Sequence, residues 1–181
     1  MSKLTQSLVV LACFAAVSSM TTANAQSGSR QTQTAKTQMV KPQMAKSEMS
    51  RAFTNGYNVP SSGVAIEGYC PVCYLAAGKA VKGTAEFTYD YEGVTYWFVN
   101  DAARKTFAAS PKKYLPAYGG WCALGVAMGQ RFPVDPTNFK IVDGRIMLFL
   151  KNKNVDGAAI WSKGQSSNLA KADANWKKLK G

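Results

Sequence analysis

Apolar and polar residues alternate on both sides of two short turn sequences in the second half of the chain. The segment "EFTYDYEGVTYWFV" alternates around Glu92-Gly93, and "FKIVDGRIMLFL" carries apolar runs on either side of Asp143-Gly144. Alternation on both sides of Glu92-Gly93 indicates a β-hairpin, and Asp-Gly between two apolar runs is the strongest short-range hairpin signal. We therefore predict one hairpin from Glu86 to Val99 and a second around Asp143-Gly144.

Helical signals occupy the segments between and after these hairpins. "NDAARKTFAASP" begins with an N-cap at Asn100 or Asp101, ends before Pro111 and turns Ala103 and Phe107 inward. Small apolar residues predict a short buried helix over about 121–128. An amphipathic closing helix is predicted from apolar residues at helical spacing: Leu169, Ala172, Trp176 and Leu179.

Strands that come in hairpins, rather than alternating singly with helices, indicate an α+β class. We expect a small antiparallel sheet built from hairpins, packed with short helices and a C-terminal amphipathic helix. The folded part is expected to span residues 61–181, which is enough for one domain with a core of its own.

The N-terminus has the features of a secretory signal peptide. Lys3 precedes an apolar run from Leu8 to Val17, and small residues end in the cleavage signature Ala23-Asn24-Ala25. We therefore predict a signal over 1–25, cleavage after Ala25 and a periplasmic or secreted protein. Because the apolar run is shorter than the roughly 20 residues that cross a bilayer, no transmembrane segment is expected in the mature form. A retained anchor and a lipoprotein cut before Cys13 are the alternatives.

Residues 26–60 are rich in Gln, Ser, Thr, Lys and Met and show no sustained strand or helix period. Such a composition predicts a disordered linker. Within it, Met39, Met44 and Met49 recur five positions apart, a spacing that fits no helical face. Thioethers are soft ligands, so the three methionines are candidate secondary Cu(I) ligands; compositional drift of a linker is the alternative.

The chain is strongly basic, with 22 Lys and Arg against 10 Asp and Glu, and a net charge of +12. The excess lies at the two ends of the mature chain; residues 151–181, for example, carry seven lysines against Asp156 and Asp173. In an exported protein this favours an anionic envelope surface or an acidic protein partner, with a solvated basic surface as the alternative. The basic segments contain no motif for stacking bases or cradling phosphates, so no nucleic-acid partner is predicted.

The region from about residue 63 onward resembles the YHS domain family, in the longer form found in secreted bacterial proteins. The resemblance rests on "GYCPVCYLAAGKAVKGTAEFTYDYEGVTYWFVNDAARKTFAASPKKYLPAYGGWCALGVAMGQ" and continues through "VDPTNFKIVDGRIMLFL" to "NLAKADANWKKL". It implies a compact α+β domain associated with metal handling, but no single reaction.

Two departures from the family pattern concern the thiols. The further cysteines of metal-associated YHS domains correspond here to Val99 and Ala103. The secreted branch usually has Asp and Ala where this chain has Cys70 and Cys73, whereas a cysteine at the position of Cys122 is typical of it. The site of this chain therefore copies neither branch.

Three cysteines remain in the predicted mature chain: Cys70, Cys73 and Cys122. The chain has no histidine, so a three-thiolate set, completed by Met128 or Met147, favours Cu(I), with zinc as the alternative metal. Two other interpretations stay open: thiol-disulfide exchange by the Cys-Pro-Val-Cys pair, and a structural disulfide in a non-metal binding module.

Catalysis of other kinds has little support in the sequence. Without histidine the chain cannot form a Ser-His or Cys-His nucleophile pair, and no carboxylate pair suited to acid-base chemistry stands out. A binding role is thus favoured over an enzymatic one. Tyr69, Tyr74 and Trp121 flank the cysteines and are candidate aromatics of a ligand pocket, although core packing explains most aromatic residues of this region.

Overall fold

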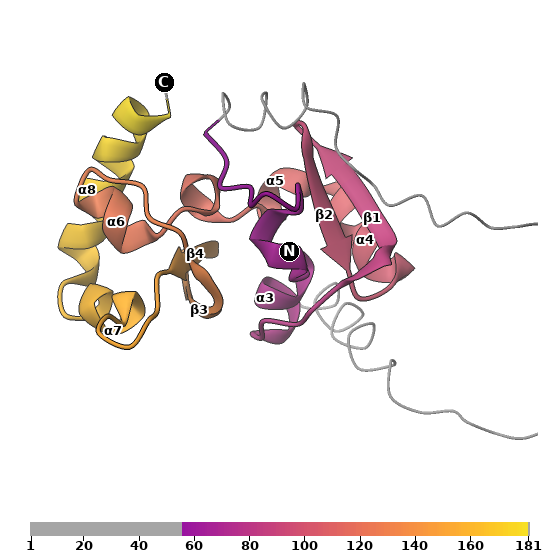
Figure 1. Cartoon of the computed structure of the whole chain (residues 1–181), viewed down its shortest axis with the longest axis horizontal. Coiled ribbons are helices and arrows are strands. Elements are labelled where there is room, and N and C mark those ends of the chain that lie inside the picture. Colours follow the sequence, from indigo (N-terminus) through magenta and orange to yellow (C-terminus); the bar gives the residue numbers. More distant parts are fainter. Residues whose placement is uncertain (1–55, 181) are drawn as a thin grey trace, which may run out of the picture.

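The computed structural model describes residues 56–180, which form two similar units side by side (Figure 1). In Figure 1 the unit containing α3, β1, β2 and α4 lies beside the unit containing α6, β3, β4, α7 and α8, and Ile146 and Leu148 of β4 pack into the core of the first unit. The elements follow in this order: η1 (Ala65–Gly68), α3 (Pro71–Ala77), β1 (Thr84–Tyr91), β2 (Val94–Phe98), α4 (Asp101–Ala109), α5 (Pro111–Tyr114), η2 (Ala117–Gly120), α6 (Ala123–Ala127), β3 (Asp135–Val142), β4 (Arg145–Phe149), α7 (Gly157–Ser162) and α8 (Gln165–Leu179).

The first unit is built on the hairpin of β1 and β2. Glu92 and Gly93 both have positive φ, at 52° and 78°, as a two-residue hairpin turn of primed type requires. After β2, the side chain of Asn100 accepts a hydrogen bond of 2.8 Å from the backbone N–H of Ala103 and so caps α4. This cap fixes where α4 begins, and α4 then packs its inner face against the hairpin.

Phe107 on α4 is the centre of the first core. Its ring is fully buried and lies 5.0 Å from the ring of Tyr96 and 5.2 Å from that of Phe98, measured between centroids. Tyr89, Tyr91 and Tyr114 complete the ring cluster around it. Tilted and edge-on pairs of this kind add to the stabilisation that burial alone provides.

The second unit repeats the first, strand for strand. Thr84 pairs with Phe98 and Thr88 with Trp97 in the first hairpin, whereas Asp135 pairs with Phe149 and Phe139 with Leu148 in the second. The remaining pairs correspond in the same way, and both hairpins carry an irregularity at the same place, before the fifth residue of the first strand. We conclude that residues 64–109 and 116–162 are two copies of one structural unit.

The elements that flank the hairpins repeat as well. Asp156 caps α7 by accepting from the backbone N–H of Ala159 at 3.1 Å, as Asn100 does for α4. Trp161 of α7 stacks on Phe149 at 5.5 Å, where Phe107 of α4 stacks on Phe98. The second unit thus has a core of its own, on the same plan as the first.

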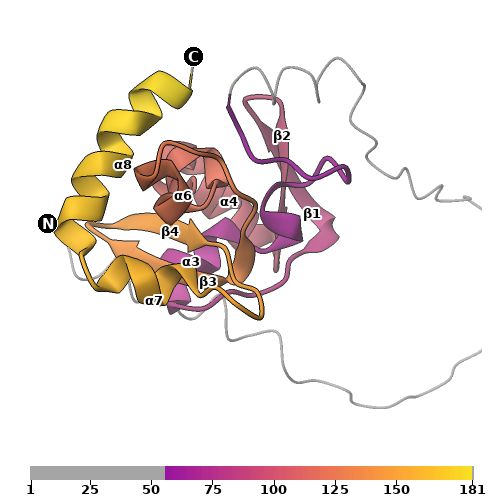
Figure 2. The same cartoon turned by 60° about the vertical axis from the view of Figure 1, so that its left-hand side comes forward.

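Helix α8 has no counterpart in the first unit and covers the second one (Figure 2). The Asn175 side-chain amide donates to the carbonyls of Val126 and Ala127, both at 3.1 Å, and thereby satisfies two acceptors at the end of α6. Asp173 accepts from Arg145 and from the Tyr118 hydroxyl, both at 2.9 Å. Among the described residues, no helix is long and apolar enough to cross a membrane.

The α+β class predicted from the sequence is confirmed, with two two-stranded antiparallel sheets as the observed form. Both predicted hairpins and the helices near 101–109, 123–127 and 165–179 are present. Residues 56–60, which the predicted linker includes, contact the folded part: the Asn58 backbone N–H donates to Gly119 O, and the Trp121 ring N–H donates to Gly56 O. The predicted signal peptide and the rest of the linker lie outside the described residues.

We predict that Phe107→Ala lowers the free energy of unfolding by about 3–5 kcal/mol, because it leaves a cavity among the surrounding rings. Ile141→Ala is the matched control, since Ile141 is a large apolar residue that is exposed on β3. Urea denaturation should show little change for the control. A loss below about 1 kcal/mol for Phe107→Ala would contradict the central role of this ring.

Candidate dithiol site

A left-handed turn positions the cysteine pair at the start of α3. Ile66 and Glu67 both have φ of 52°, and Gly68 follows with φ of 81°. A Cβ at Gly68 would approach the Trp97 ring to 2.8 Å, so only glycine fits against β2 at this point. Cys70 comes next as the N-cap of α3, and Pro71 occupies the first turn of the helix.

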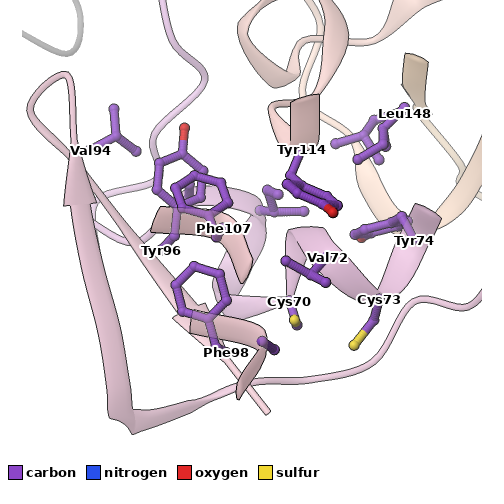
Figure 3. Packing of buried hydrophobic residues seen from close by; sticks show 14 of the residues in the cluster. Cys70, Val72, Cys73, Tyr74, Val94, Tyr96, Phe98, Phe107, Tyr114 and Leu148 are labelled. Carbon is purple, nitrogen blue, oxygen red and sulfur yellow. The ribbon is translucent and has the colours of Figure 1, made fainter. Parts of the chain in front are cut away.

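Cys70 and Cys73 are both completely buried, and they form no disulfide. Figure 3 shows their side chains leaving α3 on the same side, below Val72 and near Phe98. The backbone N–H of Cys70 donates to the Val81 carbonyl at 2.8 Å, which fixes the N-terminus of the helix to the segment before β1. The two thiols are therefore held together in a rigid, dry part of the core.

Hydrogen bonding lowers the pKa of the Cys70 thiol to about 7. The main cause is the hydrogen bond from the Cys73 side chain; burial opposes it, and the backbone N–H groups of Val99, Cys73 and Val72 add to the lowering. Cys70 is thus substantially ionised at neutral pH, unlike an ordinary thiol. Because the folded-state pKa is the lower one, the resulting stabilisation is complete above the unfolded pKa and is lost as the pH falls through about 7.

Such a pair can do two kinds of chemistry. A thiolate next to a second thiol is a soft two-ligand set for a metal ion. It is also a nucleophile with a resolving partner for disulfide exchange. Because neither sulfur is exposed, any reactant must enter through a local opening of the start of α3 or its surroundings, which favours small reactants over large ones.

Cys122 occupies the equivalent position in the second unit, at the N-cap of α6. Its backbone N–H donates to Phe132 O at 3.1 Å, and its sulfur accepts from the backbone N–H of Leu150 at 3.3 Å. These contacts correspond to those of Cys70 with Val81 and Val99. Cys122 is buried in the second core, whereas Cys70 and Cys73 belong to the first.

The structure does not bring Cys122 together with the pair. Within residues 56–180 there is no group of three or more His, Cys, Asp or Glu side chains that could hold a metal ion. The structure therefore does not form the three-thiolate arrangement suggested by the sequence. Cys70 begins α3 in the first core, whereas Cys122 begins α6 in the second core. Metal binding itself stays a prediction, and it now concerns Cys70 and Cys73.

The second unit has no space for a second thiol at the position equivalent to Cys73. Gly125 stands there, and a Cβ on it would come within 2.6 Å of the Phe132 ring. Phe132 therefore fills the volume beside α6 that a side chain at this position would need. The dithiol is a feature of the first unit alone.

The predicted pocket aromatics lie in different surroundings. Tyr74 is fully buried beside the pair, donates to Pro136 O at 2.8 Å and meets the Phe139 ring edge-on at 4.8 Å. Tyr69 is half-buried, with the Lys82 ammonium 4.6 Å from its ring centroid. Trp121 belongs to the second unit and donates to Gly56 O at 2.7 Å. Core packing and local hydrogen bonds thus account for all three.

The two methionines of the described residues lie away from the dithiol core. Met128 is 65% exposed after α6, and Met147 is buried in the second core with Cys122. Met39, Met44 and Met49 lie outside the described residues, so their role as Cu(I) ligands stays a prediction.

Comparison with protein-family models, with curated proteins and with solved structures gives no match. Membership of the YHS family therefore stays a prediction from the sequence. The internal repeat and the dithiol geometry stand on the structure alone.

We predict that Cys73→Ala raises the pKa of Cys70 toward that of an ordinary thiol, because the main hydrogen bond to its sulfur is lost. Cys73→Ser keeps a hydroxyl that can donate to the Cys70 sulfur, so the pKa of Cys70 should stay closer to 7 in this variant. Thiolate absorbance at 240 nm, followed against pH in a background lacking Cys13 and Cys122, measures both. An unchanged midpoint in Cys73→Ala would show that the Cys73 side chain does not control the ionisation of Cys70.

Proposed function

We propose that the protein is an exported dithiol protein that binds one soft metal ion, Cu(I), between Cys70 and Cys73. The observation that carries the proposal is the buried pair itself, in which the pKa of Cys70 is about 7 and the two thiols share a hydrogen bond. Export rests on the signal peptide predicted from the sequence.

The choice of metal follows from the number and softness of the ligands. Thiolates favour Cu(I) over hard cations, which take oxygen ligands. A structural zinc ion usually takes four ligands, and the described residues offer no group of three at any place. Zinc is accordingly the weaker alternative.

Ionisation of Cys70 also supports metal binding at neutral pH. Cys70 is partly ionised there, so the ion displaces fewer protons than it would from two ordinary thiols. The affinity for Cu(I) is expected to fall as the pH drops below 7, because protons then compete with the ion for both sulfurs. The resemblance to YHS domains, which are associated with metal handling, points in the same direction.

Thiol-disulfide exchange is the second candidate, and the lowered pKa of Cys70 favours it. In this reaction the Cys70 thiolate attacks a disulfide of a partner and forms a mixed disulfide, releasing one partner thiolate. Cys73 then attacks the Cys70 sulfur, which closes the Cys70–Cys73 disulfide and releases the second partner thiolate. The partner gains two electrons, and the complete burial of both sulfurs restricts this route to small disulfides or an opened form.

The basic surface has a separate proposed partner. Lys177 and Lys178 in the last turn of α8 are exposed, and Asp173, one helical turn before Lys177, is the acidic residue that interacts with Lys177. An anionic envelope surface or an acidic protein is the partner that this charge favours, and its binding would weaken as salt rises.

We predict that reduced protein takes up one equivalent of Cu(I) at the pair in anaerobic titration against a competing chelator. Cys70→Ser and Cys73→Ser should each lower the Cu(I) affinity more than a hundredfold. Mutation of residues that only support a metal ligand typically costs about 10–100-fold in affinity, and loss of the ligand itself should cost more. Cys122→Ser is the matched control and should leave affinity and stoichiometry unchanged.

Replacing Met39, Met44 and Met49 with Leu in the same experiment separates the linker from the folded site. No Cu(I) uptake by reduced protein would reject the proposal. Rapid closure of a Cys70–Cys73 disulfide by oxidised glutathione, together with absent metal uptake, would favour disulfide exchange instead.

A further inference from the structure

A cavity of about 160 Å³ lies between the two units, apart from the dithiol. Its walls come from the 57–60 segment, from both left-handed turns, from the start of β2 and from Pro133 and Val134. The turns η1 and η2 are equivalent elements of the repeat, so the cavity forms where the two copies meet. Pockets between structural units are common places for small ligands.

The 57–60 segment is held firmly as one wall of this cavity. The backbone N–H of Asn58 donates to Gly119 O at 2.8 Å, and its side-chain amide donates to Gly120 O at 3.0 Å. At the end of the same segment, Gly56 accepts from the Trp121 ring N–H at 2.7 Å. These three hydrogen bonds fix the segment to η2 and Trp121. This wall of the cavity is therefore in place before any ligand binds.

One polar group in the wall faces the cavity without a hydrogen-bond partner among residues 56–180. Tyr96 is 1% exposed and lines the cavity, and its hydroxyl makes no hydrogen bond to any residue of the described part of the chain. Figure 3 shows this hydroxyl directed away from Cys70 and Cys73. A hydroxyl that faces a cavity in this way can donate a hydrogen bond to, or accept one from, a polar group of a ligand.

The other polar groups of the wall are already engaged. The Tyr57 hydroxyl donates to Glu92, and the Asn58 amide is bound to Gly120 as described. Lysine and arginine are absent from the lining, whose only charged residue is Glu67. An anionic ligand would therefore be disfavoured, whereas an uncharged ligand meets proline, valine and tyrosine surfaces.

We propose that this cavity binds one small uncharged aromatic molecule of single-ring size, whose polar group hydrogen-bonds to the Tyr96 hydroxyl. The volume fits, because an apolar cavity of about 150 Å³ accommodates a benzene molecule. The unpartnered hydroxyl sets the orientation of the ligand and distinguishes phenol-like molecules from plain hydrocarbons. The site is separate from the dithiol, and its occupation does not depend on metal binding.

Phenol is the probe, with benzoate as a control of similar size that carries a negative charge. Saturation-transfer NMR and a titration of the full chain should show saturable phenol binding and none for benzoate. Tyr96→Phe should weaken phenol binding about threefold to tenfold, the usual effect of one hydrogen bond. Tyr114→Phe is the matched control, because Tyr114 is a buried tyrosine of the same core that does not line the cavity.

Two further measurements keep the test independent of any folding defect in Tyr96→Phe. Val134→Phe should fill the cavity and abolish binding, and wild-type protein labelled at valine methyl groups should show contacts from phenol to Val94 and Val134. No saturable binding, equal binding of benzoate, or binding that Tyr96→Phe and Val134→Phe leave unchanged would each overturn the proposal.

Discussion

The structure depends on how each left-handed turn docks onto the second strand of its own hairpin. Val64 forms a parallel bridge with Thr95, and Pro116 forms the same bridge with Ile146. Each turn then reverses the chain so that a cysteine begins the next helix, with its sulfur beside the backbone N–H that follows the hairpin. The bridge, the turn and the sulfur contact are local to each unit. They explain why Cys70 and Cys122 are buried in different cores.

The two units differ in what lies next to that cysteine. The first copy has Cys73 one helical turn later, and the shared hydrogen bond makes Cys70 acidic. The second copy has Gly125 at this place and packs Phe132 over it. The first unit therefore holds the buried dithiol, while the second contributes the α8 cover and half of the cavity between the units.

Local signals in the sequence were sufficient for most of the elements. Glu92-Gly93 and Asp143-Gly144 specify their hairpins through backbone conformation, and Asn100 caps α4 as its residue type predicts. The repeat does not follow from these local signals, although "GYC" and "GWC" mark the two helix starts.

The convergence of Cys122 on the pair could not be judged from spacing, because it depends on which core each helix enters. Val99 acts on Cys70 through its backbone N–H, and the Phe132 ring fills the space that a side chain at Gly125 would need. Residue type alone reveals neither effect. The cavity was missed for the same reason, since it needs the relative placement of two distant turns.

X-ray absorption at the copper edge tests the central claim most directly. Full-length protein loaded anaerobically with one equivalent of Cu(I) should show two sulfur neighbours, and the spectrum should be the same in Cys122→Ser. A third sulfur neighbour that disappears in Cys122→Ser, or copper coordinated without sulfur, would contradict a site made by Cys70 and Cys73.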